Sequence, residues 1–321
     1  MKHISIIGGN GFLGKVLCNQ LSDSKINHTV FDINLSDNQE NIIHCDVRDK
    51  KSLEIIEKDS VIVNLAAVHR DDVRPVSKYD DVNVGGAINI CKVAREKKIK
   101  TIIFTSSVAV YGFADPGTDE NGKINFFNDY GRTKYLAEKE YEKWFQEDPQ
   151  SRNLIILRPT VIFGEDNRGN VYNLLNQIAS KKFIMFGNGK NIKSMAYVEN
   201  VAEFIRFIIK SDIKGFKKFN YVDKPDLNMN ELTSFARKIL FNKSNVGIRL
   251  PSFLGFLIGY LADIIGYLIN KPLPVSYIRV KKFMSTTSFS TNIDNKKFIP
   301  KYTLKEGLLK TLDYEFKKNK S

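Results

Sequence analysis

A chain of 321 residues, 42% hydrophobic and 26% charged, can bury a sizeable core, which excludes an intrinsically disordered protein. The net charge of +13 comes without aromatic and basic interleaving or a nucleic-acid motif, so we expect no nucleic-acid partner. Cys18, Cys45 and Cys91 are spaced for neither a disulfide framework nor a zinc site, which predicts no metal and a reducing, cytoplasmic compartment. Met1 leads straight into an apolar run, without the basic leader of an exported protein.

Short apolar runs alternate with longer amphipathic stretches along the chain. We expect strands at 4–7, 29–31, 61–65, 101–105 and 154–157. We expect helices at 12–21, 82–94, 198–209, 230–240 and 304–316. The alternation predicts an α/β fold, a doubly wound parallel sheet (Rossmann) with a smaller C-terminal lobe. The pattern loosens after Arg158 and Pro159, so we place the two parts at 1–158 and 159–321.

A glycine-rich turn, GGNGFLG, follows the first predicted strand and opens the first predicted helix. Gly8, Gly11 and Gly14 allow a sharp turn and a close approach of a pyrophosphate to the free N–H groups of the helix. Asp32 ends the next strand, about 20 residues further on, where a carboxylate accepts hydrogen bonds from a ribose. Its charge would repel a 2′-phosphate. The turn and Asp32 therefore predict NAD as the cofactor, in preference to NADP. The alternative is that Asp32 is only a turn or capping residue.

The catalytic signal is TSSVAVYG at 105–112 followed by YGRTK at 130–134. Tyr130 and Lys134 are four residues apart and share one face of a helix, and an ammonium beside a phenol lowers the pKa of the phenol. Tyr130 can then accept a proton from a sugar hydroxyl. Ser107, at the end of a strand, can hydrogen-bond the same oxygen. We therefore predict Ser107, Tyr130 and Lys134 as the catalytic residues of an oxidoreductase acting on a sugar.

These motifs together resemble the extended short-chain dehydrogenase/reductase family of nucleotide-sugar epimerases and dehydratases, along nearly the whole chain. The resemblance implies that Tyr130 takes the 4-hydroxyl proton, that C4 gives hydride to NAD, and that hydride returns to the other face of the 4-keto sugar. Dehydratases of this fold carry Asp-Glu where this chain has Val108 and Ala109, which disfavours dehydration. The expected cofactor contacts are Gly8, Gly11, Phe12, Leu13, Gly14, Asp32, Asp46, Val47, Leu65, Ala66, Ala67, Asn83, Tyr130, Lys134 and Pro159.

Several longer runs are similar to a narrower group of bacterial epimerases, which convert N-acetylglucosamine to N-acetylgalactosamine on undecaprenyl diphosphate for O-antigen and lipopolysaccharide synthesis. These runs lie at 69–73, 158–175, 193–201, 220–232 and 278–283. Lys193 stands where nucleotide-sugar enzymes commonly place an arginine. The expected substrate contacts are His69, Ser107, Asn167, Arg168, Asn170, Lys193 and Arg279. The same catalytic set also serves a UDP-N-acetylglucosamine 4-epimerase and a 4-keto-sugar nucleotide reductase, and a catalytically silent NAD-binding regulator is the alternative from outside the enzymes. The likeness also implies a homodimer.

The segment 251–269 reads PSFLGFLIGYLADIIGYLI, with Asp263 as its only charge. A spanning helix needs about 20 apolar residues, so a full span is disfavoured. Two alternatives remain: a helix in the membrane interface and a buried helix of the C-terminal lobe, of which the second is slightly favoured. Residues 251–321 contain twelve Lys or Arg against five Asp or Glu, an excess of seven. The basic tail and the apolar segment together predict peripheral contact with the cytoplasmic face of the inner membrane.

Overall fold

The structure is a computed structural model that describes residues 2–35, 42–70, 73–211, 213–269, 271, 273 and 275–317. The chain divides into two compact units, each composed of several segments. The first contains 1–162, 196–222 and 289–302, and the second contains 163–195, 223–288 and 303–321. The sequence placed a single boundary between 158 and 159. The chain first leaves unit 1 after Ile162 and then rejoins it twice.

Unit 1 is built on a seven-stranded parallel sheet with the order β11-β6-β5-β4-β1-β2-β3. The strands are β1 (Ile4–Ile7), β2 (His28–Asp32), β3 (Ile42–His44), β4 (Val61–Asn64), β5 (Thr101–Thr105), β6 (Asn153–Pro159) and β11 (Phe216–Tyr221). The two central strands, β1 and β4, are buried along their whole length. This order confirms the expected doubly wound fold, and it places the topological switch point between β1 and β4, where ligands bind at the carboxyl ends of the strands.

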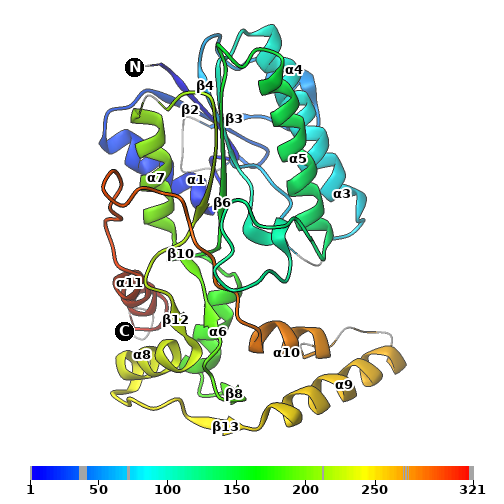
Figure 1. Ribbon diagram of the computed structural model, residues 1–321, viewed down its shortest axis with the longest axis vertical. Helices are drawn as coiled ribbons and strands as arrows, with labels where there is room; N and C mark the ends of the chain where they lie inside the picture. The colour runs from blue at the N-terminus through cyan, green and yellow to red at the C-terminus, as the bar shows by residue number, and fades with distance from the viewer. Residues whose placement is uncertain are drawn as a thin grey trace. The chain divides into compact units, whose positions relative to one another are not determined.

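Helices cover both faces of this sheet (Figure 1). On one face lie α1 (Phe12–Asp23) and α7 (Val198–Lys210), which pack against each other. On the other lie α4 (Gly86–Glu96) and α5 (Asp129–Gln146). The shorter elements are α2 (Lys50–Leu53), α3 (Ser77–Tyr79), a π-helical turn at Asp80–Gly85 and a 3₁₀ turn at Val108–Tyr111. Burial on both faces explains why the strands read as continuous apolar runs.

Unit 2 contains most of the remaining helices. They are α6 (Asn170–Ala179), α8 (Met229–Phe241), α9 (Ser252–Leu268), α10 (Tyr277–Met284) and α11 (Leu304–Phe316). The short strands β8 (Ile184–Phe186) and β13 (Ile248–Leu250) pair in parallel, and β9 (Ile192–Lys193) and β12 (Leu227–Asn228) pair antiparallel. A further two-stranded sheet joins β7 (Val161–Phe163) and β10 (Met195–Tyr197), most of whose residues belong to unit 1. Capping boxes at Asn228 with Glu231 and at Thr303 with Glu306 begin α8 and α11.

Helix α9 departs from the alternative that the sequence slightly favoured. It was expected to be a buried core helix, but only Gly255 and Gly259 of its residues are buried. Among the described helices, none combines the length and apolar character needed to cross a membrane. The core interpretation of residues 251–269 is therefore wrong, because this helix exposes its large side chains.

Candidate functional site

The turn between β1 and α1 requires glycine at two positions. Gly8 has a φ of +79°, and a Cβ there would lie 2.6 Å from the backbone nitrogen of Ala66. A Cβ on Gly14 would lie 2.5 Å from the carbonyl oxygen of Gly9. Gly11 caps α1 without a side-chain hydrogen bond. The first N–H groups of the helix, those of Phe12, Leu13 and Gly14, therefore have no side-chain cap, which is the arrangement that accepts a phosphate.

Asp32 ends β2 beside this turn and is 8% exposed. Its two carboxylate oxygens accept hydrogen bonds from the backbone nitrogens of Asn10 (3.0 Å) and Asn34 (2.9 Å). Asp32 therefore orders the turn and still retains acceptor capacity for a ribose hydroxyl. Asp46 is held differently, since the guanidinium of Arg48 binds both of its oxygens and holds the pKa of that carboxyl below its ordinary value.

The segment that follows β4 forms the wall opposite the glycine turn. The backbone nitrogen of Leu65 donates to the carbonyl of Ile7 (2.8 Å), which continues the pairing of β1 and β4. Asn64 accepts a hydrogen bond from the nitrogen of Ala66 (3.0 Å) through its side chain. Ala66 and Ala67 are half-buried. The backbone of Leu65 and Ala66 lies so close to Gly8 that position 8 has no room for a Cβ.

Asn83 lies in the π-helical turn, and its amide is occupied by protein groups. It accepts from the nitrogen of Val68 (2.9 Å) and donates to the carbonyl of Val68 (3.0 Å) and to the hydroxyl of Thr133 (2.9 Å). Asn83 therefore fastens the segment after β4 to helix α5, one residue before Lys134. Val47, another expected cofactor contact, is buried. Its side chain packs close to Gly86, where a Cβ would lie 2.8 Å from it.

The catalytic candidates come from β5 and α5. Ser107 follows β5 and caps the 3₁₀ turn, where its Oγ accepts a hydrogen bond from the nitrogen of Ala109 (3.1 Å). Tyr130 is the second residue of α5 and is half-buried. The side chain of Asn128 caps this helix by accepting a hydrogen bond from the nitrogen of Gly131 (2.9 Å). The hydroxyl oxygens of both candidates are thus carried by residues that lie at a capped start of a helix or 3₁₀ turn.

Lys134 lies one helical turn after Tyr130 and is 2% exposed. Its Nζ donates to the carbonyl of Thr105 (2.7 Å) and lies 4.7 Å from the ring centre of Phe104. Burial lowers the pKa of Lys134 to about 7. Lys134 is therefore close to the midpoint between its charged and neutral forms at neutral pH.

The pKa of His69 is lowered mainly by desolvation of its ring. A hydrogen bond with the backbone of Ala67 raises this pKa, and the charge of Lys134 lowers it further.

A buried ion pair between Glu138 and Arg158 lies next to the segments that carry Ser107 and Lys134. Glu138 follows Lys134 by one helical turn, and its carboxylate binds the guanidinium of Arg158 at 2.5 and 2.8 Å. The same carboxylate accepts a hydrogen bond from the hydroxyl of Ser106 (2.5 Å), the residue before Ser107. Arg158 also donates to the hydroxyl of Tyr111 (2.7 Å). Pro159 ends β6 directly after Arg158. The pair connects α5, β6 and the segment after β5 that carries Ser107.

Three of the expected substrate residues lie at the start of helix α6 or just before it, in unit 2. The side chain of Asn167 accepts a hydrogen bond from the nitrogen of Gly169 (3.0 Å). Arg168 forms an ion pair with Glu315 and lies 4.3 Å from the ring centre of Tyr172. Asn170, the first residue of α6, is exposed. Arg168 is thus already engaged by a carboxylate and a ring within its own unit.

The other two substrate candidates in unit 2 lie on β9 and α10. Lys193 donates to the carbonyls of Lys282 (2.8 Å) and Ser285 (2.6 Å), and burial lowers its pKa to about 8. Arg279 lies on α10 and is exposed. The cofactor candidates and the catalytic candidates all belong to unit 1. Of the substrate candidates, His69 and Ser107 belong to unit 1 and the others to unit 2. Of the run at 69–73, residues 71 and 72 lie outside the described part of the chain.

Sequence reasoning missed three residues that build this site: Asn10, Thr133 and Glu138. Asn10 donates its backbone N–H to Asp32 and its side-chain amide to the carbonyl of Asn34 (2.9 Å). Of the three, only Glu138 had a signal in the sequence: it lies four residues after Lys134, and therefore on the same face of the helix. The other two are recognised only through partners distant in the sequence.

Comparisons with known proteins agree with this geometry. Residues 4–221 match the model of the NAD dependent epimerase/dehydratase family. The chain is 45% identical to the N-acetyl-alpha-D-glucosaminyl-diphospho-ditrans,octacis-undecaprenol 4-epimerase of Escherichia coli O157:H7, over 98% of this chain and 95% of that protein. Two solved structures share the fold. UDP-glucose 4-epimerase of Thermotoga maritima, solved with UDP-glucose, has a TM-score of 0.75 at 19% identity, covering 99% of this chain and 100% of that one. UDP-glucuronic acid 4-epimerase of Bacillus cereus, solved with NAD, has a TM-score of 0.73 at 19% identity, covering 97% and 98%.

Proposed function

The chain belongs to the NAD dependent epimerase/dehydratase family, and from this premise we propose that it interconverts N-acetylglucosamine and N-acetylgalactosamine on undecaprenyl diphosphate. The observation that carries the proposal is the 45% identity, over 98% of the chain, to an enzyme named for that reaction. The intact set of Ser107, Tyr130 and Lys134 supports it, because a catalytically silent regulator has no need of all three. The product would serve the synthesis of a surface polysaccharide such as O-antigen.

The residues of unit 1 fit the NAD on which this family depends. The cradle formed by Gly8 and Gly14 would be filled by any Cβ, and the uncapped start of α1 suits a pyrophosphate. Asp32 supplies a buried carboxylate for a ribose. When bound, NAD supplies the acceptor and donor of hydride at the sugar carbon. Since each cycle would return the hydride, turnover needs no added reductant.

The chain's own residues manage the proton. Tyr130 accepts the proton of the 4-hydroxyl and later returns it. Lys134, when charged, favours the phenolate form of Tyr130, and the Thr105 carbonyl holds its Nζ at 2.7 Å. Ser107 holds the sugar oxygen through its hydroxyl group, whose Oγ is oriented by the nitrogen of Ala109.

The proposed substrate includes a polyprenyl chain, which stays in the bilayer. The enzyme would therefore act from the cytoplasm at the inner face of the membrane. His69, Asn167, Arg168, Asn170, Lys193 and Arg279 remain our candidates for contacts with the sugar and diphosphate. By likeness to the family, we propose that the protein acts as a homodimer.

Two other enzyme functions use the same catalytic residues: a UDP-N-acetylglucosamine 4-epimerase and a 4-keto-sugar nucleotide reductase. The test incubates the purified protein, without added reductant, with N-acetylglucosaminyl-diphospho-undecaprenol in detergent and, separately, with UDP-N-acetylglucosamine. We expect N-acetylgalactosamine from the lipid-linked substrate. Conversion of the UDP-sugar alone would establish the nucleotide-sugar epimerase, and strict dependence on added NADH with its net consumption would establish the reductase.

A further inference from the structure

Helix α9 presents its large apolar side chains outward. Among the described residues of 251–269, those exposed by at least 40% include Phe253 (64%), Leu257 (50%), Ile258 (42%), Tyr260 (59%), Leu261 (48%), Ile264 (41%), Ile265 (49%), Tyr267 (87%), Leu268 (74%) and Ile269 (51%). Soluble proteins rarely expose a contiguous apolar patch of this kind unless it binds something. We call these residues the α9 apolar surface.

The protein side of α9 is lined instead by small residues. One face of the helix carries four small residues at helical spacing: the buried Gly255 and Gly259 and the half-buried Ala262 and Gly266. A Cβ on Gly255 would lie 2.9 Å from the ring of Phe186, and one on Gly259 would lie 2.9 Å from the backbone of Tyr277. Because the glycines allow this close packing, the bulky residues are left pointing away from the unit. The arrangement is the reverse of a helix that contributes to a core.

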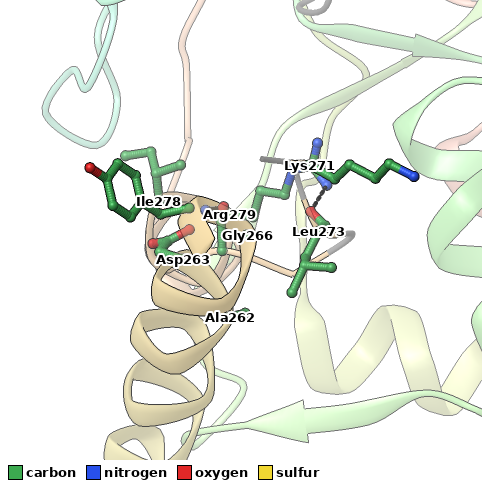
Figure 2. A pocket seen from close by; sticks show the side chains of 9 residues that line it. Ala262, Asp263, Gly266, Lys271, Leu273, Ile278 and Arg279 are labelled. Carbon is green, nitrogen blue, oxygen red and sulfur yellow. Dashed lines mark hydrogen bonds between the residues drawn. The ribbon is translucent and has the colours of Figure 1, made fainter. Parts of the chain in front are cut away.

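The only charged residue of α9 is used to build the hairpin with α10. The Asp263 carboxylate accepts a hydrogen bond from the backbone nitrogen of Tyr277 (2.9 Å), in the first turn of α10. The guanidinium of Arg279 donates to the carbonyl of Leu273 (3.2 Å) and so closes the connecting loop (Figure 2). The carboxylate of Asp263 is therefore directed toward α10 and is not part of the α9 apolar surface.

Exposed cations lie on the segment that follows α9 and along α10. Lys271 and Arg279 line a cavity of about 450 Å³ beside Asp263, and the side chain of Lys271 extends away from α9 (Figure 2). Lys281 lies on α10, and it is exposed, as are Lys271 and Arg279. Apolar bulk next to exposed cations is the composition that complements an anionic lipid surface. No described helix can cross a bilayer, so α9 would have to lie along its surface.

We propose that the α9–α10 hairpin docks the protein on the surface of an anionic lipid bilayer. The α9 apolar surface enters the interface between headgroups and acyl chains, with Tyr260 and Tyr267 at headgroup depth. Lys271 and Lys281 lie among the phosphates. This inference rests on the proposed function for its purpose, since a lipid-linked substrate needs an enzyme at the bilayer. The surface itself is tested without any substrate.

The test is flotation of the full-length protein with vesicles of phosphatidylglycerol and phosphatidylethanolamine, compared with vesicles of phosphatidylcholine alone. We expect the wild type to float with the anionic vesicles. A triple variant, Leu257→Ser, Leu261→Ser and Leu268→Ser, should bind at least about 100-fold more weakly, because each leucine loses its apolar contact. Lys271→Gln with Lys281→Gln should weaken binding to anionic vesicles about 30-fold and leave the weak binding to phosphatidylcholine unchanged.

A matched control removes three exposed apolar residues from unit 1: Leu35→Ser, Ile55→Ser and Ile299→Ser, which are 61%, 55% and 78% exposed in the wild type. This control should float like the wild type. Equal flotation of the wild type and the α9 triple variant, or no flotation of either, overturns the proposal. If light scattering shows instead that the triple variant converts a wild-type dimer to a monomer while neither floats, a second copy of the chain covers α9, and membrane docking is refuted.

The proposed function fails separately. A wild type that converts the lipid-linked sugar in detergent but never floats refutes the docking and leaves the epimerase standing. A wild type that floats but acts on UDP-sugars alone supports the docking and refutes the lipid-linked substrate.

Discussion

The buried Lys134 should make the enzyme less stable than a variant that lacks its charge. Its pKa falls from 10.5 to about 7 in the folded protein. Each unit of pKa difference corresponds to about 1.36 kcal/mol, so ionisation of this group lowers the free energy of unfolding by up to about 5 kcal/mol at low pH, and by about 4 kcal/mol at pH 7. The hydrogen bond to the Thr105 carbonyl offsets about 1 kcal/mol of that cost. Lys134→Met, which keeps an unbranched chain, is therefore expected to stabilise the fold by about 3 kcal/mol at pH 7.

The effect has a defined pH window. The unfolded chain keeps this proton up to about pH 10.5, whereas the folded protein releases it above about pH 7. Wild-type stability contributed by Lys134 therefore rises between these values, and the advantage of Lys134→Met shrinks across the same window and is lost above it. The measurement is urea unfolding of the cofactor-free protein at several pH values from 6 to 10, with the exposed Lys58→Met as the control. A Lys134→Met protein that is less stable than the wild type, or a difference that does not change with pH, would refute this reasoning.

Three further predictions concern the cofactor and the proton. Tyr130→Phe should lower kcat about 10²–10⁴-fold with little change in NAD affinity, and calorimetry with NAD alongside turnover would check this split. Asp32→Ala should weaken NAD more than NADP, and equal loss for both cofactors in fluorescence titrations would contradict its assignment to the ribose. Gly8→Ala should abolish NAD binding, because its Cβ would meet Ala66, whereas Gly117→Ala has a similar φ of +83° and open space around it; the second variant should lose about 1 kcal/mol of stability in thermal unfolding and still bind NAD.

The parts of the site that could be predicted from sequence are those defined by local patterns. The glycine turn, Asp32 at the end of β2 and the Tyr130–Lys134 pair each depend on residues within one strand or one helical turn. These features were found where expected, between β1 and α1, at the end of β2 and on α5. Local patterns succeed here because backbone conformation and helical spacing decide them.

The supporting contacts could not be predicted, because they join residues far apart in the sequence. Glu138 meets Arg158 across 20 residues, and Asn83 reaches Thr133 across 50. Asn83 illustrates the consequence. The sequence motifs placed it among the expected cofactor contacts, but its amide is occupied by Val68 and Thr133, so it also acts by positioning the helix that carries Lys134. The return of residues 196–222 to the first unit has the same origin, since strand β11 pairs with β6 across about 60 residues.

The case of α9 concerns which side of an apolar helix faces the protein. Hydrophobicity alone cannot distinguish a core helix from an interfacial one, because both are rich in the same residues. What distinguishes them is the side that carries the bulk. A core helix buries its large side chains, whereas α9 packs through Gly255 and Gly259 and exposes Phe253 and Leu268. The glycines at helical spacing were visible in the sequence, and in a core helix each would cost helix stability and leave a gap in packing. Their presence is explained if the bulky face is needed on the outside, as the proposed docking of α9 on a membrane surface requires.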